Sequence, residues 1–241
     1  MLKITFDKLF TYENVYRAHI KARCSKRAKA PIVRFEMSLI SNVRKIYEEI
    51  KRGRYAVRGY NSFVIYEPKK REIQTLRYPD RVVQHVICDN ALSSYFTKRA
   101  IMDNTVCQKG KGMHFALRRF ESMVRKYILN NGVKGYVFKC DISKYFATIP
   151  HLKLKELING HIADCKLQRL ISHIIDSYHT KVEYLEKYNF SVLGTRERTE
   201  RGLPIGNQTS QIFGMFYLDK LDRFIKEKLR IKIYSRYMDD F

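Results

Sequence analysis

The chain has 241 residues, of which 45% are hydrophobic and 13% aromatic, and this composition excludes a disordered protein. No apolar run approaches the roughly 20 residues of a membrane-spanning helix, and the five cysteines are scattered without a Cys-x-x-Cys motif, which argues against a disulfide framework or a zinc site. The formal net charge of +23 points to a phosphate-bearing partner such as nucleic acid, a merely basic protein being the alternative.

Residues 1–60 are predicted to form a basic, helical N-terminal extension. Their basic cluster, which includes Arg23, Lys26 and Arg27, is either a solvated helix face or a nucleic-acid contact. Apolar residues then follow at three- and four-residue steps and predict an amphipathic helix that ends at Gly53; they are Met37, Ile40, Val43, Ile46, Tyr47 and Ile50. The first residues contain an early acid and no sustained apolar core, so we expect no signal peptide and a cytoplasmic protein.

A β-hairpin with a basic turn is predicted next. The segments 63–66 and 73–76 are rich in strand formers, and the turn between them contains Lys69, Lys70 and Arg71. Cations at a hairpin tip could contact a triphosphate, but a solvated turn fits the pattern equally. Asp80 is then a candidate N-cap for a helix whose apolar stripe comprises Val82, Val83, Val86, Ile87 and Leu92.

The middle of the chain contains a glycine-rich basic loop and a predicted strand. The loop includes Lys109 and Lys111, but it lacks the spacing of a phosphate-binding P-loop. A helix is predicted over 115–125. Residues 135–140 are strong strand formers and run directly into Asp141, which is either a helix cap or a carboxylate at the edge of a sheet.

The C-terminal third is predicted to contain helices, a charged loop at 195–201 and a strand. The turn-rich segment 202–211 opens a long helix whose apolar face continues to Leu229. Residues 231–237 alternate as a strand does and are followed by Asp239 and Asp240. Because adjacent strand residues face opposite ways, only a tight turn can bring both carboxylates to one site. Such a turn suits a salt bridge or a divalent metal ion.

Together these segments resemble a reverse transcriptase over residues 61–241. Residues 138–146 resemble the first palm motif of that family, 202–211 the second, and 237–240 the third. The resemblance implies an α+β fold with the fingers and palm of a right-hand polymerase, in which an antiparallel palm sheet packs on helices. The fingers would be residues 61–135 and the palm 136–241. The family's thumb is missing, so we expect a piece of a longer enzyme.

The second motif indicates a branch of the family. Ile205 stands where most reverse transcriptases have glutamine, and Gln211 stands where they have proline; both resemble the bacterial and phage enzymes of diversity-generating retroelements, which misincorporate opposite template adenines. Residues 71–73 and 79–84 instead resemble group II intron enzymes, so a group II intron- or retron-type enzyme is the runner-up. A non-catalytic RNA-binding or phage-defence protein with this fold is a further alternative.

The resemblance also implies a two-metal polymerase site. Asp141, Asp239 and Asp240 would be catalytic and, with the carbonyl of Ile142, would hold two Mg²⁺ ions, for which Mn²⁺ could substitute. The residues that would bind the dNTP are Lys69, Lys70, Arg71, Phe146, Ile205 and Gly206, with the Phe146 ring excluding a 2′-hydroxyl.

Partners follow from the same resemblance. We expect template RNA, a primer or cDNA, dNTPs and a small basic accessory protein, and no membrane. The residues predicted to contact nucleic acid are Arg23, Lys26, Arg27, Lys109, Lys111, Tyr237 and Met238.

Overall fold

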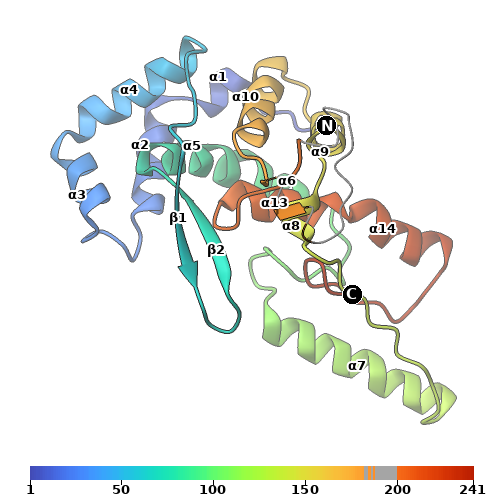
Figure 1. Ribbon diagram of the computed structural model, residues 1–241. Helices are drawn as coiled ribbons and strands as arrows, with labels where there is room; N and C mark the ends of the chain where they lie inside the picture. The colour runs from blue at the N-terminus through green and yellow to red at the C-terminus, as the bar shows by residue number, and fades with distance from the viewer. Residues whose placement is uncertain (182–183, 186, 188–199) are drawn as a thin grey trace. The chain divides into compact units, whose positions relative to one another are not determined.

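The computed structural model describes residues 1–181, 184–185, 187 and 200–241 (Figure 1). The chain forms two compact units that interleave along the sequence: unit 1 comprises residues 1–94 and 146–210, and unit 2 comprises residues 95–145 and 211–241. The domains predicted from the sequence, 1–60, 61–135 and 136–241, are each one continuous stretch. Because a compact unit need not coincide with a functional domain, the division into units does not test these boundaries, which stay a prediction. Most of the charged loop predicted at 195–201 lies outside the described residues.

Unit 1 is built mainly from helices around an apolar core. They are α1 (Phe6–Leu9), α2 (Tyr12–Ala22), α3 (Ala30–Met37), α4 (Leu39–Lys51), α5 (Tyr78–Ile87), the π-helical turn η1 (Cys88–Leu92), α9 (His151–Asn159) and α10 (Cys165–Asp176). Helix α2 packs against α4 and α5. The apolar stripe predicted for α5 and η1 is completely buried, which confirms it.

The predicted amphipathic helix before Gly53 is confirmed only in part. Val43, Ile46 and Ile50 are buried on α4. Met37 and Ile40, however, are 80% and 86% exposed. The reason is that α3 ends at Met37 and a new helix begins at Leu39, so these two residues do not share the buried face.

The predicted N-cap role of Asp80 is wrong. Helix α5 begins at Tyr78, with a proline in its first turn, so Asp80 lies inside the helix. The Asp80 side chain is completely buried and accepts hydrogen bonds from the Tyr55 hydroxyl at 3.1 Å, the Arg58 backbone N–H at 3.0 Å and the Arg58 guanidinium at 2.7 Å. A buried carboxylate requires such partners, and these tie α5 to the segment that leads into the hairpin.

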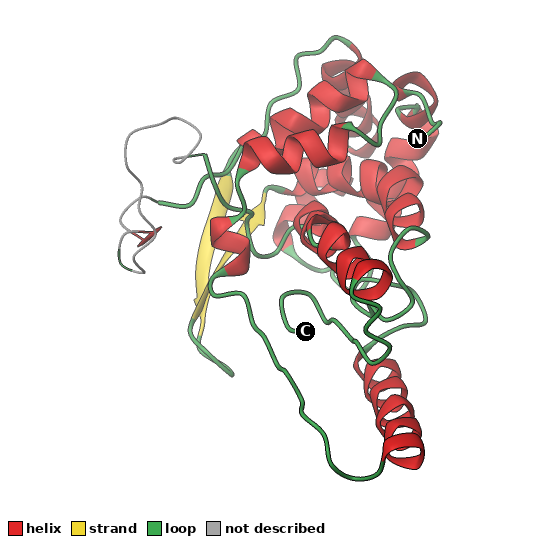
Figure 2. Ribbon diagram, turned by 90° about the vertical axis from the view of Figure 1, so that its right-hand side faces the viewer, coloured by secondary structure: helices red, strands yellow, loops and turns green. Residues whose placement is uncertain are grey.

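The predicted hairpin is confirmed. Strands β1 (Tyr60–Ile65) and β2 (Arg71–Leu76) pair antiparallel, with Phe63 opposite Ile73 (Figure 2, yellow). It is the one sheet in the part of the chain that the structure describes, where all other strand-like pairings are isolated bridges.

Unit 2 contains the long helix α7 (Met113–Asn131), and the chain passes between the units in α6 (Ser93–Thr97), α8 (Tyr145–Thr148) and α13 (Gln208–Tyr217). The long helix predicted to reach Leu229 is interrupted at Leu218, which has φ −93° and ψ 10°. The chain continues as α14 (Asp219–Arg223) and the π-helical turn η2 (Phe224–Lys228). Because the helical register changes there, Phe224 and Leu229 are exposed rather than part of the core.

The strands predicted at 135–140 and 231–237 are not formed in the described residues. A strand requires a continuous ladder to a neighbour. These segments instead have single backbone pairings, which join Asn104 to Arg236, Tyr237 to Asp240 and Asp141 to Asp240. No described helix combines the length and apolar character needed to cross a membrane.

We predict that Asp80→Ala destabilises the protein by about 3 kcal/mol, because it removes the buried carboxylate that Tyr55 and Arg58 bind and leaves the partly buried Arg58 guanidinium with Glu49 alone. Urea unfolding followed by circular dichroism measures this loss. The matched control is Asp7→Ala, which removes an exposed partner of Lys51 and should leave the midpoint unchanged. Equal midpoints for the two variants would contradict the structural role of Asp80.

Candidate active site

A tight turn carries two of the predicted carboxylates. The Tyr237 N–H donates to the Asp240 carbonyl at 2.8 Å, and the Asp240 N–H donates to the Tyr237 carbonyl at 3.2 Å. Met238 and Asp239 are therefore the two central residues of a hairpin turn. Met238 has φ +62°, as the first central residue of the turns favoured in two-residue hairpins requires. The tight turn predicted at this position is confirmed.

This turn is joined to the segment that ends in Asp141. The Cys140 N–H donates to the Phe241 carbonyl at 2.7 Å, and the Phe241 N–H donates to the Cys140 carbonyl at 2.9 Å. Asp141 is thereby paired antiparallel with Asp240. Residues opposite each other in such a pair project to the same face. The pairing therefore places two exposed carboxylates, about a hundred residues apart in sequence, next to each other.

Asp239 is half-buried beside a neutral tyrosine. Burial raises the pKa of the Tyr145 hydroxyl, and the negative charge of Asp239 adds to this shift. Tyr145 therefore keeps its proton and donates it to the Gly214 carbonyl at 2.7 Å. This bond connects the segment that follows Asp141 to helix α13.

The described residues contain no cluster of three or more His, Cys, Asp or Glu side chains that could hold a metal ion. The Asp141–Asp240 pair nevertheless fits a hard cation chemically. Mg²⁺ in proteins is commonly held by one or two carboxylates, with water and substrate phosphates completing its octahedron. The Lys139 ammonium lies 3.9 Å from an oxygen of Asp240, and both side chains are exposed.

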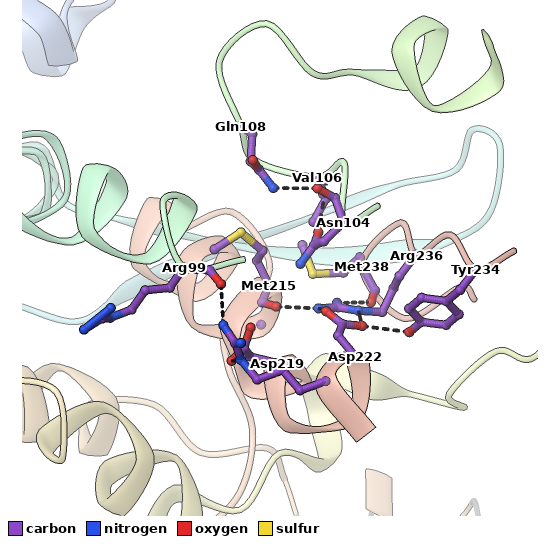
Figure 3. A network of polar contacts seen from close by, with 12 residues as sticks. Arg99, Asn104, Val106, Gln108, Met215, Asp219, Asp222, Tyr234, Arg236 and Met238 are labelled. Carbon is purple, nitrogen blue, oxygen red and sulfur yellow. Dashed lines mark hydrogen bonds and ion pairs between the residues drawn. The ribbon is translucent and has the colours of Figure 1, made fainter. Parts of the chain in front are cut away.

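A buried arginine network next to the turn was not predicted from the sequence (Figure 3). The side chain of Arg236 is completely buried and binds both carboxylate oxygens of Asp222. It also donates to the carbonyl of Met238 in the turn. The sequence gives no signal for it, because Arg236 falls at an alternate position of the segment 231–237 that also contains Lys232.

The residues predicted to contact the base and sugar of a dNTP are gathered within unit 1. The Ile205 carbonyl accepts the Gln74 N–H of β2 at 2.9 Å, and the Phe146 carbonyl accepts the Leu203 N–H at 2.7 Å. Gly206 has φ +124°, and a Cβ atom there would lie 2.8 Å from the Gln74 carbonyl oxygen. Only glycine fits this close approach to β2.

Lys69, Lys70 and Arg71, at the far end of the hairpin, are exposed. None of them forms an ion pair with a described residue. Their charges are thus available to an anionic ligand. These residues belong to unit 1 and the three aspartates to unit 2.

The basic residues predicted to contact nucleic acid differ in how far their charge is neutralised. Arg23 and Arg27 both pair with Glu36, whereas Lys26 is exposed without an ion pair among the described residues. In unit 2, Lys111 donates to the Met102 carbonyl at 3.3 Å. Burial lowers the pKa of Lys111, and the Arg119 charge acts in the same direction.

The remaining residues of this group are accessible in unit 2. Lys109 and Tyr237 are exposed, and Met238 is half-buried. Their role in nucleic-acid binding stays a prediction.

Comparison with known proteins relates the chain to proteins encoded by introns. No protein-family model matches it. It is 25% identical over 186 residues to the group II intron-encoded protein LtrA of Lactococcus lactis, covering 76% of this chain. It is 30% identical over 94 residues, 39% of this chain, to the COX1/OXI3 intron 2 protein of Saccharomyces cerevisiae. The matches span 28% and 10% of these longer relatives. The chain is therefore distantly related to group II intron-encoded proteins.

Proposed function

We propose that the chain is the fingers and palm of a reverse transcriptase, an RNA-directed DNA polymerase. The observation that carries the proposal is the backbone pairing of Asp141 with Asp240. Asp141 lies in the segment that resembles the first palm motif of reverse transcriptases, and Asp240 in the segment that resembles the third. Two carboxylates must lie next to each other if they are to share a metal ion. The two segments that carry these aspartates meet in this isolated antiparallel bridge.

The proposed reaction is attack of a primer 3′-hydroxyl on the α-phosphate of a dNTP, with release of pyrophosphate. Asp141, Asp239 and Asp240 would hold two Mg²⁺ or Mn²⁺ ions, with the Ile142 carbonyl as a further ligand. Bound there, such ions stabilise charge on the attacking and leaving oxygens. The carboxylates themselves orient the ions and balance their charge.

Nucleotide recognition is assigned to residues of unit 1. Arg71, together with Lys69 or Lys70, would bind the triphosphate, and the planar fork of an arginine suits bidentate contact with phosphate. Phe146 would lie against the sugar and exclude a 2′-hydroxyl. Ile205 and Gly206 would lie against the nascent base pair, a position consistent with their fixed attachment to β2.

Two branches of the family compete as the finer assignment. Ile205 and Gln211 support error-prone cDNA synthesis of the diversity-generating type, aided by a small basic accessory protein. The relationship to group II intron-encoded proteins supports the other branch. In both branches, the net charge of +23 would favour binding of the anionic template RNA and primer.

We predict that Ile205→Gln lowers the misincorporation rate, particularly opposite template adenine, because glutamine restores a hydrogen-bonding group beside the nascent pair. Sequencing of cDNA copied from a defined RNA measures the error spectrum. Ile205→Leu, which keeps the site apolar, is the matched control and should leave the spectrum unaltered. If glutamine and leucine give the same spectrum as isoleucine, the group II intron branch is favoured.

We further predict that Asp239→Asn reduces DNA synthesis about a thousandfold while RNA affinity is largely retained, since it removes a metal ligand and not an RNA contact. Primer extension on a homopolymer RNA with Mg²⁺ and labelled dNTP measures synthesis, and filter binding measures RNA affinity.

Glu227→Gln is the control for this substitution, because it alters an exposed carboxylate of the same unit whose one ion-pair partner among the described residues is Arg223. It should leave both measurements unchanged. RNA binding without any dNTP incorporation by the wild-type protein would support the non-catalytic RNA-binding alternative instead.

A further inference from the structure

Arg236 and Asp222 form an ion pair in unit 2, and the side chains of both are completely buried (Figure 3). The Arg236 Nε donates to Asp222 Oδ1 at 2.7 Å, and Nη2 donates to Oδ2 at 2.6 Å. The Tyr234 hydroxyl donates to the same Oδ1 at 2.7 Å. This bidentate contact fixes the plane of the guanidinium, because both members of the fork are engaged.

The fixed guanidinium also holds two backbone carbonyls. Nη2 donates to the Met215 carbonyl of α13 at 2.9 Å, and Nη1 donates to the Met238 carbonyl at 2.7 Å. The Met238 carbonyl belongs to the central peptide of the turn that carries Asp239 and Asp240. The two primed turn types differ mainly by a flip of this peptide. A hydrogen bond to its carbonyl therefore selects one turn type.

We propose that Arg236 is a positioning residue: anchored on Asp222, it locks the Met238–Asp239 peptide in one orientation and so fixes the directions of the catalytic carboxylates. In the absence of this bond the turn exchanges between two orientations, and Asp239 leaves the position it needs to share a cation with Asp141. The role in metal binding rests on the proposed function, whereas the lock on the turn does not.

A purely stabilising role would not require this arrangement. Buried ion pairs can often be replaced by apolar side chains without loss of stability, so stability alone is a weak reason for one. Arg223 provides an internal comparison in the same unit. It pairs with Asp219 at 2.9 Å and donates to the Arg99 carbonyl at 2.7 Å, but it contacts no residue of the turn.

Methyl-¹³C methionine NMR of the purified protein tests the lock directly. The Met238 signal, assigned by its loss in Met238→Leu, should be single in the wild type. In Arg236→Lys it should shift or split in two, because lysine cannot bind Asp222 as a fork and reach both carbonyls. Arg223→Lys, the matched control, should leave it unchanged, and the signal of Met113 on α7 should stay constant throughout.

Titration with Mn²⁺ supplies a second measurement, since a paramagnetic ion near the turn broadens the Met238 signal. The Mn²⁺ concentration for half-broadening should rise about tenfold in Arg236→Lys, as is typical when a residue that orients metal ligands is lost. In Arg223→Lys it should match the wild type.

The outcomes separate the two hypotheses. An unaltered Met238 signal and an unaltered Mn²⁺ response in Arg236→Lys would overturn the lock while leaving the proposed function intact. A changed Met238 signal in Arg236→Lys, with no Mn²⁺ broadening even in the wild type, would establish the lock and count against the metal site.

A loss of folding in Arg236→Lys would be recognised by collapse of the other methionine signals. The near-isosteric variants Asp222→Asn and Tyr234→Phe then decide, because each loosens the anchor of the guanidinium and leaves Arg236 in place. A shift of the Met238 signal in these folded variants supports the lock, and its absence in both overturns it.

Discussion

A buried guanidinium needs hydrogen-bond partners for its N–H groups, and in unit 2 this requirement organises the surroundings of the turn. Arg236 directs four of its five N–H groups to one carboxylate and two carbonyls, which tie helices α13 and α14 to the turn. Its backbone adds two further bonds, to the Asp103 carbonyl and the Thr105 N–H. The segment around residue 104, two helices and the carboxylate-bearing turn are thus assembled about a single side chain.

Unit 1 depends on close backbone approach as well as on a buried ion pair. The loop at 203–207 is attached to β2 through the Ile205 carbonyl, and Gly206 allows contact distances that no other residue permits. The hairpin is in turn preceded by the buried Asp80–Arg58 pair. Short-range strand pairing, one glycine and one ion pair therefore hold together the residues that we assign to the nucleotide.

The parts of the fold that were predictable from the sequence are those set by local patterns. The hairpin and the buried stripe of α5 follow from alternation and from three- and four-residue steps. The strands at 135–140 and 231–237 were predicted wrongly because strand formation depends on a partner ladder, which propensity does not reveal. Asp80 was misassigned for a related reason: whether an acid caps a helix or pairs inside it depends on residues distant in sequence.

The candidate site also contains some residues that were predicted from the sequence and others that were not. The three aspartates were predicted from a family resemblance and not from periodicity, and the pairing of Asp141 with Asp240 is compatible with that resemblance. Arg236 and Asp222 could not be predicted because their significance arises only when the two are buried together. Helix and strand propensities treat both charged residues as ordinary surface residues.

The interleaving of the two units has a consequence for how the chain folds during synthesis. Unit 1 includes residues 146–210, so it is complete only after most of the chain has been made, although its helices α2, α4 and α5 can pack on one another earlier. Unit 2 is likewise divided, and residues 95–145 have no complete core until 211–241 emerge. Helix α7 has no buried residue even in the folded chain, so its apolar side chains are exposed both during and after synthesis, and exposed apolar surface of this kind favours aggregation.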